Sequence, residues 1–246
     1  MNFFTIITAR SSSKRLKNKI MLNITKELRT IDILIKRSKF IGLPIILATS
    51  NSKSDDKLVN YVKKKYKINI FRGSLNNKIK RWYDCFVKYK INAACFVDGD
   101  DLLFDFYLYK KNINYMRHIS KPLMMKNPSN IVTGAFTYII NYKFLEKIFK
   151  KIKNVKNVDV IDNYYKNIKN VKKIKLTKIL KNKKIRLTLD YKDDYLFFKK
   201  LLTKFKFNLP TKNIVQFLVN EKKLININFY LNIAWKKNQL NEIKNK

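Results

Sequence analysis

The chain has 246 residues, 46% of them hydrophobic and 29% charged, and carries a formal net charge of +38. This length suits one α/β domain, and the charged fraction excludes a membrane protein. Two cysteines do not make an extracellular disulfide framework. Residues 1–14 lack the pattern of a signal peptide, and no apolar run reaches the about eighteen residues of a membrane span. We expect a cytoplasmic protein without a membrane partner.

Two interpretations of the net charge stay open. A charge of this size is typical of a protein that binds nucleic acid or another polyanion. Lysine, however, is spread along the whole chain, together with many Ile and Asn residues. We favour a drift in composition that fills solvated surface positions with lysine, and we expect no specific nucleic-acid partner.

The N-terminal half alternates apolar runs with amphipathic stretches. Four apolar runs have the residues of buried strands, namely 3–8, 44–48, 68–71 and 93–97. Three stretches between them have apolar residues at helical spacing, namely 31–41, 55–66 and 77–89. Strand, loop and helix repeated at this length predict a doubly wound, mostly parallel sheet, with ligands at the carboxyl ends of the strands.

The C-terminal half is less regular. Its expected elements are a strand at 136–140, a helix at 144–151, a strand at 185–189 and a helix at 193–204. In the last helix, Leu196, Phe197 and Leu201 are expected to face the core. The lysine-rich stretch 147–184 is interpreted as an excursion from the sheet. Residues 1–246 are expected to form a single domain.

A basic, serine-rich loop follows the first predicted strand. Residues 9–19 contain three consecutive serines as well as Arg10, Arg15 and Lys19. Hydroxyls and closely spaced backbone N–H groups suit a polyphosphate, and an arginine can hold a phosphate through two hydrogen bonds. The Gly-x-x-x-x-Gly-Lys pattern of a P-loop is missing. A phosphate-binding loop and a solvated basic loop are both consistent with this charge.

Acidic residues follow two of the predicted strands. The sequence Asp98-Gly99-Asp100-Asp101 comes directly after one of them, in a chain with only 17 acidic residues. Clustered carboxylates beside a buried strand are costly unless they are paired or hold a cation. Mg²⁺ favours one or two carboxylates together with phosphate oxygens. Asp190 ends the strand at 185–189, so Asp100 and Asp190 could form one metal site. The alternatives are an acidic turn and a helix cap.

Four sequence motifs occur in a fixed order. They are Ile6–Lys19, Phe71–Ser74 followed by Arg81, Phe96–Asp105, and Arg186–Asp190 followed by Asp193 and Asp194. Together they resemble the cytidylyltransferases that make CMP-activated sugar acids, a group that includes CMP-Kdo synthetase, acylneuraminate cytidylyltransferase and the spore-coat polysaccharide synthesis type. The resemblance covers residues 3–204. It implies a three-layer, Rossmann-like nucleotide-diphospho-sugar transferase fold.

The resemblance also implies a reaction. CMP would pass from CTP to a sugar or sugar-like acid with release of pyrophosphate, in surface polysaccharide or glycoconjugate synthesis. The implied nucleotide-binding residues are Ala9, Arg10, Ser12, Ser13, Arg15, Lys19, Arg72 and Gly73. Asp100 and Asp190 would bind Mg²⁺, and Asp100, Lys19 and Arg15 would be the catalytic residues. Arg81 would support the loop around Arg72, and a homodimer is expected.

The sequence departs from the family pattern at three places. Lys17-Asn18 replaces the usual Pro-Gly, Asn77 replaces an Asp, and residues 159–165 have no Glu-His-Val element. That element usually helps to form the acceptor pocket, so the sequence does not name the acceptor. The stretch 147–184 is expected to form an acceptor pocket or a dimer contact. The alternatives are a transferase of the same fold with another nucleotide or a non-sugar acceptor, a member that binds without turnover, and a basic polyanion-binding protein.

Overall fold

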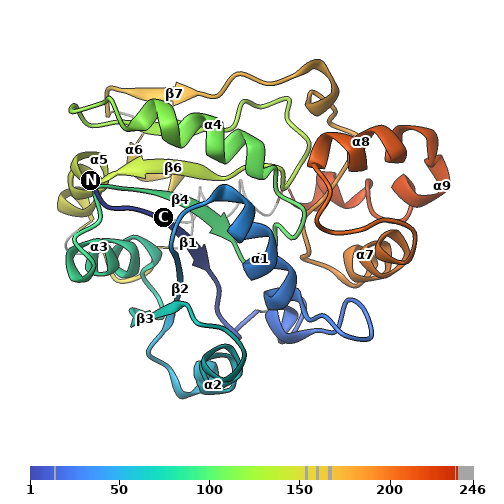
Figure 1. The fold of residues 1–246 in the computed structure, drawn as a ribbon, viewed down its shortest axis with the longest axis horizontal. Helices are drawn as coiled ribbons and strands as arrows, with labels where there is room; N and C mark the ends of the chain where they lie inside the picture. The colour runs from blue at the N-terminus through green and yellow to red at the C-terminus, as the bar shows by residue number, and fades with distance from the viewer. Residues whose placement is uncertain (14, 153–154, 159–160, 166–167, 236, 238–246) are drawn as a thin grey trace.

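A seven-stranded sheet with helices on both faces forms the centre of the molecule (Figure 1). The computed structural model describes residues 1–13, 15–152, 155–158, 161–165, 168–235 and 237. The strands are β1 (Phe3–Thr8), β2 (Ile45–Ser50), β3 (Asn69–Gly73), β4 (Ala93–Asp98), β5 (Met124–Lys126), β6 (Tyr138–Asn141) and β7 (Val171–Lys173). Their order across the sheet is β3-β2-β1-β4-β6-β5-β7.

Helices lie on both faces of this sheet and beyond one of its ends (Figure 1). They are α1 (Thr30–Ser38), α2 (Asp56–Lys65), α3 (Lys78–Lys88), α4 (Phe106–Met116), α5 (Tyr142–Lys151), α6 (Asp162–Tyr165), α7 (Lys192–Lys204), α8 (Thr211–Asn220) and α9 (Lys222–Ile225). In this described part, no helix combines the length and the apolar character needed to span a membrane.

The strand pairing confirms the predicted fold class. β1 pairs in parallel with β2 and β4, and β2 pairs in parallel with β3. β6 runs antiparallel to β4 and β5, while β7 is parallel to β5. The sheet is therefore mostly parallel, and the carboxyl ends of β1, β2, β3 and β4 meet along one edge. Ligands bind at this edge in open α/β sheets.

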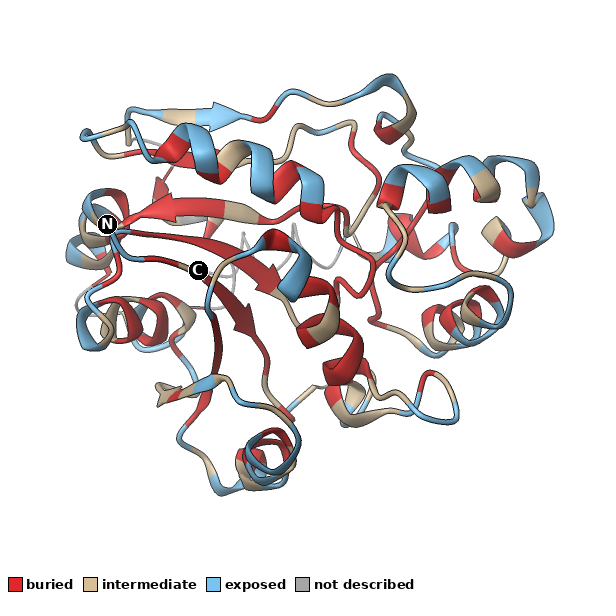
Figure 2. Ribbon diagram, viewed as in Figure 1, coloured by how far each residue is buried: buried red, intermediate tan, exposed pale blue. Residues whose placement is uncertain are grey.

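Alternating residues of each central strand serve two cores. In β1, Ile7 belongs to the core that packs against α1 and α4, and Ile6 belongs to the core that packs against α3 and α5. This alternation follows from the two-residue period of a strand. Figure 2 shows the central strands as the most continuously buried part of the chain. Apolar runs without polar alternation predicted this burial on both faces.

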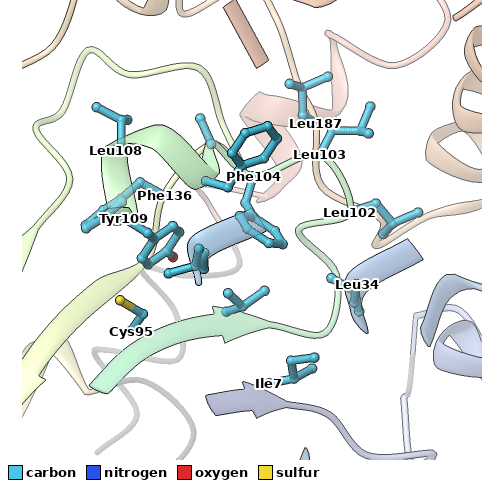
Figure 3. Close-up of a cluster of buried hydrophobic side chains, with 14 of the residues drawn as sticks. Ile7, Leu34, Cys95, Leu102, Leu103, Phe104, Leu108, Tyr109, Phe136 and Leu187 are labelled. Atoms are coloured by element: carbon cyan, nitrogen blue, oxygen red, sulfur yellow. The ribbon is translucent and has the colours of Figure 1, made fainter. Parts of the chain in front are cut away.

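An aromatic cluster supports the carboxyl end of β4. Figure 3 shows Phe104, Tyr109 and Phe136 gathered beside this strand. The Tyr109 ring stacks on Phe136 with centroids 4.4 Å apart, and its hydroxyl donates to the carbonyl oxygen of Phe96 at 2.6 Å. The same hydroxyl accepts from the backbone N–H of Thr137 at 2.8 Å. Tyr109 therefore ties α4 (Phe106–Met116) to β4 and to the residue before β6.

A buried arginine ties the C-terminal helices to this core. Arg37 of α1 donates to the carbonyl oxygens of Phe104 at 2.6 Å and Leu209 at 3.0 Å, and to the hydroxyl of Thr211 at 2.9 Å. Burial lowers the pKa of Arg37 to about 9, against the charge of Asp105. Figure 1 shows α7, α8 and α9 together beyond the end of the sheet toward which β4 points. These helices therefore flank the edge expected to bind ligands.

Two expectations for the C-terminal half are wrong. Residues 185–189 form an extended segment with one isolated bridge, Thr133 to Arg186, instead of a strand. The segment lies beside loops, so Leu187 N bonds to Thr133 O and Leu189 N bonds to Asp100 O, each at 2.8 Å. In α7, Phe197 and Leu201 are buried as expected, but Leu196 is 40% exposed.

The lysine-rich stretch 147–184 is only partly described. Its described part contains the end of α5, then α6, and then β7, which returns to the sheet edge beside β5. Residues 153–154, 159–160 and 166–167 of this stretch, and Lys14 of the first loop, lie outside the described residues. Its role as an acceptor pocket or dimer contact stays a prediction, as does the single domain.

Candidate active site

Asp55 holds the start of the serine-rich loop. Its carboxylate accepts the backbone N–H of Ser11 at 2.6 Å, the Thr49 hydroxyl at 2.9 Å and the backbone N–H of Ser50 at 3.0 Å. Burial alone would raise the pKa of Asp55, but the hydrogen bonds from Ser50, Ser11 and Thr49 lower it. The first turn of the loop is therefore fastened to the end of β2 by a buried, ionised carboxylate.

The rest of this loop is more open. Ser12 is exposed and Ser13 is half-buried. The Arg10 guanidinium donates to the carbonyl oxygen of Leu75 at 2.9 Å, which links the loop to the chain beyond β3. Asn18 has φ 52° and ψ 28°, in the left-handed region. Asn tolerates this conformation better than most residues, so it can replace the glycine of the family signature.

A glycine lets the acidic turn approach this loop. The backbone N–H of Gly99 donates to the carbonyl oxygen of Thr8 at 2.8 Å. A Cβ atom on Gly99 would lie 3.0 Å from both this oxygen and the Cβ of Ala9. Ala9 itself is buried, and the contact it makes here is with the turn backbone. The loop after β1 and the turn after β4 are therefore adjacent from their first residues.

Lys19 joins the two sides of the site. Its Nζ lies 2.8 Å from Asp100 Oδ2 and 2.8 Å from Asp190 Oδ1. Arg15 also contacts Asp190 Oδ1 at 2.8 Å. The structure therefore brings together four of the residues singled out in the sequence, although Asp100 and Asp190 are 90 positions apart.

The carboxylates at this junction differ in acidity. Burial would raise the pKa of Asp190, but Lys19 and Arg15 lower it to about 2. The pKa of Asp100 is raised by burial and by the charges of Asp190 and Asp98, against the effect of Lys19. Burial would lower the pKa of Lys19, but Asp100 and Asp190 raise it above its usual value. Asp190 and Lys19 are therefore charged at neutral pH, and a further cation would favour the ionised form of Asp100.

Asp194 fixes the position of Asp190. It accepts two hydrogen bonds from the Arg186 guanidinium, at 2.8 and 3.0 Å. It also accepts the backbone N–H groups of Asp190 at 2.9 Å and Tyr191 at 3.0 Å, and the Asn228 amide at 2.9 Å. Both Asp194 and Arg186 are buried. A fully bonded buried ion pair of this kind fixes geometry, and here it fixes the turn that carries Asp190.

The acidic turn has the donor set of a divalent-cation site. One carboxylate oxygen from each of Asp98, Asp100 and Asp101 lies within 4.8 Å of the others. Asp190 Oδ2 is buried and accepts no hydrogen bond within the described part of the chain, although Arg186 lies 3.7 Å away. Carboxylate oxygens are the ligands that Mg²⁺ prefers. The residues present therefore fit a divalent cation.

The three acids of this turn are not equivalent. Asp101 accepts a hydrogen bond from Thr137 at 3.1 Å, and burial raises its pKa well above the usual value, with Asp100 and Asp98 adding to the effect. Asp101 thus favours its neutral form. Asp98 is paired with Lys78 at 2.7 Å. Asp98 and Asp100 are half-buried, whereas Asp101 is buried, so their oxygens are more accessible to a cation.

Arg72 and Gly73 lie at the carboxyl end of β3. Arg72 donates to the carbonyl oxygens of Ser50 at 3.0 Å and Ser52 at 2.8 Å, and pairs with Asp56 at 2.7 Å. Its side chain is 32% exposed. A Cβ on Gly73 would lie 2.7 Å from the Phe71 ring, so this position requires glycine.

Arg81 lies behind this pair of residues. Its side chain is buried and donates to the carbonyl oxygen of Ser74 at 2.7 Å. The side chain passes close to Gly73, because a Cβ at that glycine would lie 3.1 Å from Arg81 Cγ. Arg81 therefore contacts the loop that it was expected to support.

The family model for cytidylyltransferases matches residues 4–223 of this chain, almost all of its length. The chain belongs to the cytidylyltransferase family. Membership implies nucleotidyltransferase activity and confirms the resemblance inferred from the four motifs. An uncharacterized protein of Methanocaldococcus jannaschii is 28% identical to this cytidylyltransferase over 235 residues, covering 93% of the chain and 95% of the relative.

Two solved structures share the fold of this cytidylyltransferase. A cytidylyltransferase from Leptospira borgpetersenii superposes with a TM-score of 0.77 at 20% identity, covering 92% of the chain and 97% of that structure. A CMP-2-keto-3-deoxy-manno-octonic acid synthetase complexed with CTP superposes with a TM-score of 0.60 at 13% identity, covering 83% and 99%. At these identities the likeness shows the fold.

Sequence reasoning missed three side chains of the site in this cytidylyltransferase. Asp55 and Lys78 were given no role, although each contacts a residue of the loop or the turn. Asp194 was noted only as part of a motif. Asp55 gave no clear signal, because four residues separate it from the end of β2, whereas Asp98 and Asp190 directly follow their apolar runs. Lys78 gave no signal, because the chain is rich in lysine.

Proposed function

We propose that this cytidylyltransferase transfers CMP from CTP to a sugar or sugar-like acid and releases pyrophosphate. One observation carries the proposal. Lys19, at the end of the basic loop after β1, places its ammonium group between two carboxylates from separate segments, Asp100 and Asp190. A triphosphate and a divalent cation need this combination of charges at one place. The cytidylyltransferase family match and the fold neighbour complexed with CTP support cytosine as the base.

The loop residues would bind the triphosphate. Backbone N–H groups and hydroxyls of Ser12 and Ser13, with the guanidinium of Arg15, would face the phosphate oxygens. Arg10 would hold the loop against the chain beyond β3, where Arg72 and Gly73 would lie beside the base or the ribose. Ala9 would contribute its backbone at the first turn.

Asp100 and Asp190 would hold Mg²⁺, with Asp98 close by. When bound, Mg²⁺ would polarise the α-phosphate and neutralise charge that develops during the transfer. Asp194 and Arg186 would keep Asp190 in place through the hydrogen bonds of the buried ion pair. The ligands would then be held in position before substrate binds.

The chain itself would catalyse by position and charge. An oxygen of the acceptor would form a bond to the α-phosphorus as the bond to the bridging oxygen of pyrophosphate breaks. Arg15 and Lys19 would face the charge that moves onto pyrophosphate. This transfer requires no nucleophile from the protein, and His118 has no part in it.

A pyrophosphate-release screen tests this proposal. The four nucleoside triphosphates are each incubated with Mg²⁺ and a panel of sugar acids, phosphonates and neutral sugars. We expect release from CTP with a sugar acid and none after chelation of the metal. Pyrophosphate release from another nucleoside triphosphate instead of CTP would contradict the proposed nucleotide. Pyrophosphate release with a neutral sugar only would contradict the proposed acceptor. The role in polysaccharide synthesis, the cytoplasmic location and the homodimer stay predictions.

The net charge of +38 favours a second candidate, a polyanion-binding protein. Binding of this kind weakens by orders of magnitude between ~50 and ~200 mM salt when several phosphates are contacted. Filter binding of a random-sequence RNA at both salt concentrations separates the two candidates. RNA binding together with no pyrophosphate release from any nucleotide would favour this second function.

A further inference from the structure

Lys19 lies between the two carboxylates to which the proposed function assigns the metal. Its Nζ is 2.8 Å from Asp100 Oδ2 and from Asp190 Oδ1, and its side chain is 14% exposed. Asp190 is 1% exposed and Asp100 is 25% exposed. One ammonium group therefore contacts both acids and offsets one of their two negative charges.

A divalent cation and this ammonium group would compete for the same two carboxylates, Asp100 and Asp190. Mg²⁺ binds carboxylate oxygens at about 2.0–2.1 Å, so a cation shared by Asp100 and Asp190 would displace the ammonium from between them. The two cations also repel each other strongly in a partly buried site. Lys19 and the metal cannot occupy this position together.

Resting on the proposed function, we propose that Lys19 is an exchangeable counter-ion of Asp100 and Asp190. Its ammonium group holds the two carboxylates until the nucleotide and metal bind, and then moves to the triphosphate. The carboxylates exchange one cation for another, and the ammonium exchanges carboxylate oxygens for phosphate oxygens. Binding of nucleotide and of metal is thereby coupled, and the coupling is reciprocal.

The chemistry of the side chains suits this exchange. Lysine is a point charge on a flexible four-carbon stem, so its ammonium can move while its backbone stays in place. Arg15 also contacts Asp190 Oδ1 at 2.8 Å, so a second cationic side chain lies beside the oxygen that Lys19 would leave. Without any counter-ion, two acids this close and this buried would be costly.

The chain offers a matched control for the exchange. Lys78 pairs with Asp98 at 2.7 Å with a side chain that is 16% exposed, so its ion pair resembles those of Lys19 in length and burial. Lys80 pairs with Asp84 at 2.7 Å on the surface of α3 and is 50% exposed. Lys19→Met removes a charge between Asp100 and Asp190, the two proposed metal ligands. Lys78→Met removes a charge beside these ligands, and Lys80→Met removes a charge far from them.

The test is Mn²⁺ binding without nucleotide, followed by electron paramagnetic resonance of the free ion. We expect Lys19→Met to bind Mn²⁺ about tenfold more tightly than the wild-type protein, since the competing ammonium is gone. Lys78→Met should change the affinity by a smaller factor and Lys80→Met should leave it unchanged. Equal affinity in wild type and Lys19→Met overturns the exchange, as does an equal gain in Lys78→Met, which would show a general effect of charge.

A second measurement covers the case in which Lys19→Met does not fold by circular dichroism. The affinity of the wild-type protein for CTP, without acceptor, is measured by calorimetry with and without Mn²⁺. The exchange predicts at least about tenfold tighter CTP binding with the metal; equal affinities overturn it. Failure of this coupling with normal pyrophosphate release would leave the proposed function standing. Absence of pyrophosphate release with normal coupling would contradict the function alone.

Discussion

The two sides of the site are built differently. The basic side is a loop, and Ser12, Arg15, Lys17 and Asn18 are exposed. The acidic side is more buried: Asp101, Asp190 and Asp194 are at most 8% exposed, and the side chains of Asp98 and Asp100 are 24% and 25% exposed. Segments with few buried contacts open more readily than buried, hydrogen-bonded ones. We therefore expect the acidic side to be preformed and the basic side to adjust when substrate binds.

We expect the largest effect from Asp190→Asn, which tests whether the acidic side binds a metal ion. If the acidic side is a metal site, losing one ligand charge should lower turnover roughly a thousandfold or more, since a metal contributes several kcal/mol to such a transfer. The fold should survive, because Asn retains the shape and the Asp194 contacts are to the backbone of residue 190. Pyrophosphate release measures turnover. Wild-type turnover in a folded variant would contradict the metal role.

Asp194→Ala tests whether the acidic side is preformed. Removal leaves the buried Arg186 guanidinium without its bidentate partner, and we expect a loss of about 3 kcal/mol in the free energy of unfolding. The neighbouring Asp193→Ala is the control, since Asp193 contacts the hydroxyl of Tyr230 and is not part of the buried pair. Urea unfolding compares the two. A similar small loss in both would show that Asp194 does not organise the turn.

Asp55→Ala tests the anchor of the loop. We expect the KM for CTP to rise about tenfold, near 1.4 kcal/mol, with a smaller change in kcat, since the variant frees the Ser11 amide and loosens the first turn. The surface variant Asp84→Ala should leave the KM unchanged. An about tenfold fall in kcat with no change in KM would show that Asp55 stabilises the transition state, and would contradict a positioning role.

Arg72→Ala should have the smallest effect. Its ion pair with Asp56 is half-exposed, and pairs of this kind contribute up to about 1 kcal/mol. We expect the KM for CTP to rise roughly threefold at low salt, with the difference shrinking as salt increases. A loss of turnover comparable to that of Asp190→Asn would show that the β3 end belongs to the catalytic side.

The regular part of the fold was predictable from local pattern. The runs that became β1, β2, β3 and β4 are rich in apolar residues, and stretches with helical spacing separate them. Residues 185–189 have the same apolar pattern, yet form no strand, because their neighbours in space are loops. Local sequence specifies an extended conformation, whereas a strand needs a partner in the fold.

The site was predictable in its residue types and less so in its contacts. Asp100 and Asp190 were expected together because each follows an apolar run, and both contact Lys19. Their metal role stays a prediction. Asp55 and Lys78 were missed because a single Asp or Lys has no periodic signal, and only the packing of β2 and α3 gives them partners. The short strands β5 and β7 were missed because three residues are too few for a periodic signal.

Gly99 has a wider consequence for how this protein tolerates change. Its N–H bonds to the carbonyl of Thr8, so one link between the loop after β1 and the turn after β4 is made by main chain only. A change of side chain at an exposed position leaves this hydrogen bond in place. A composition rich in Lys, Asn and Ile is therefore compatible with a close approach of these two segments.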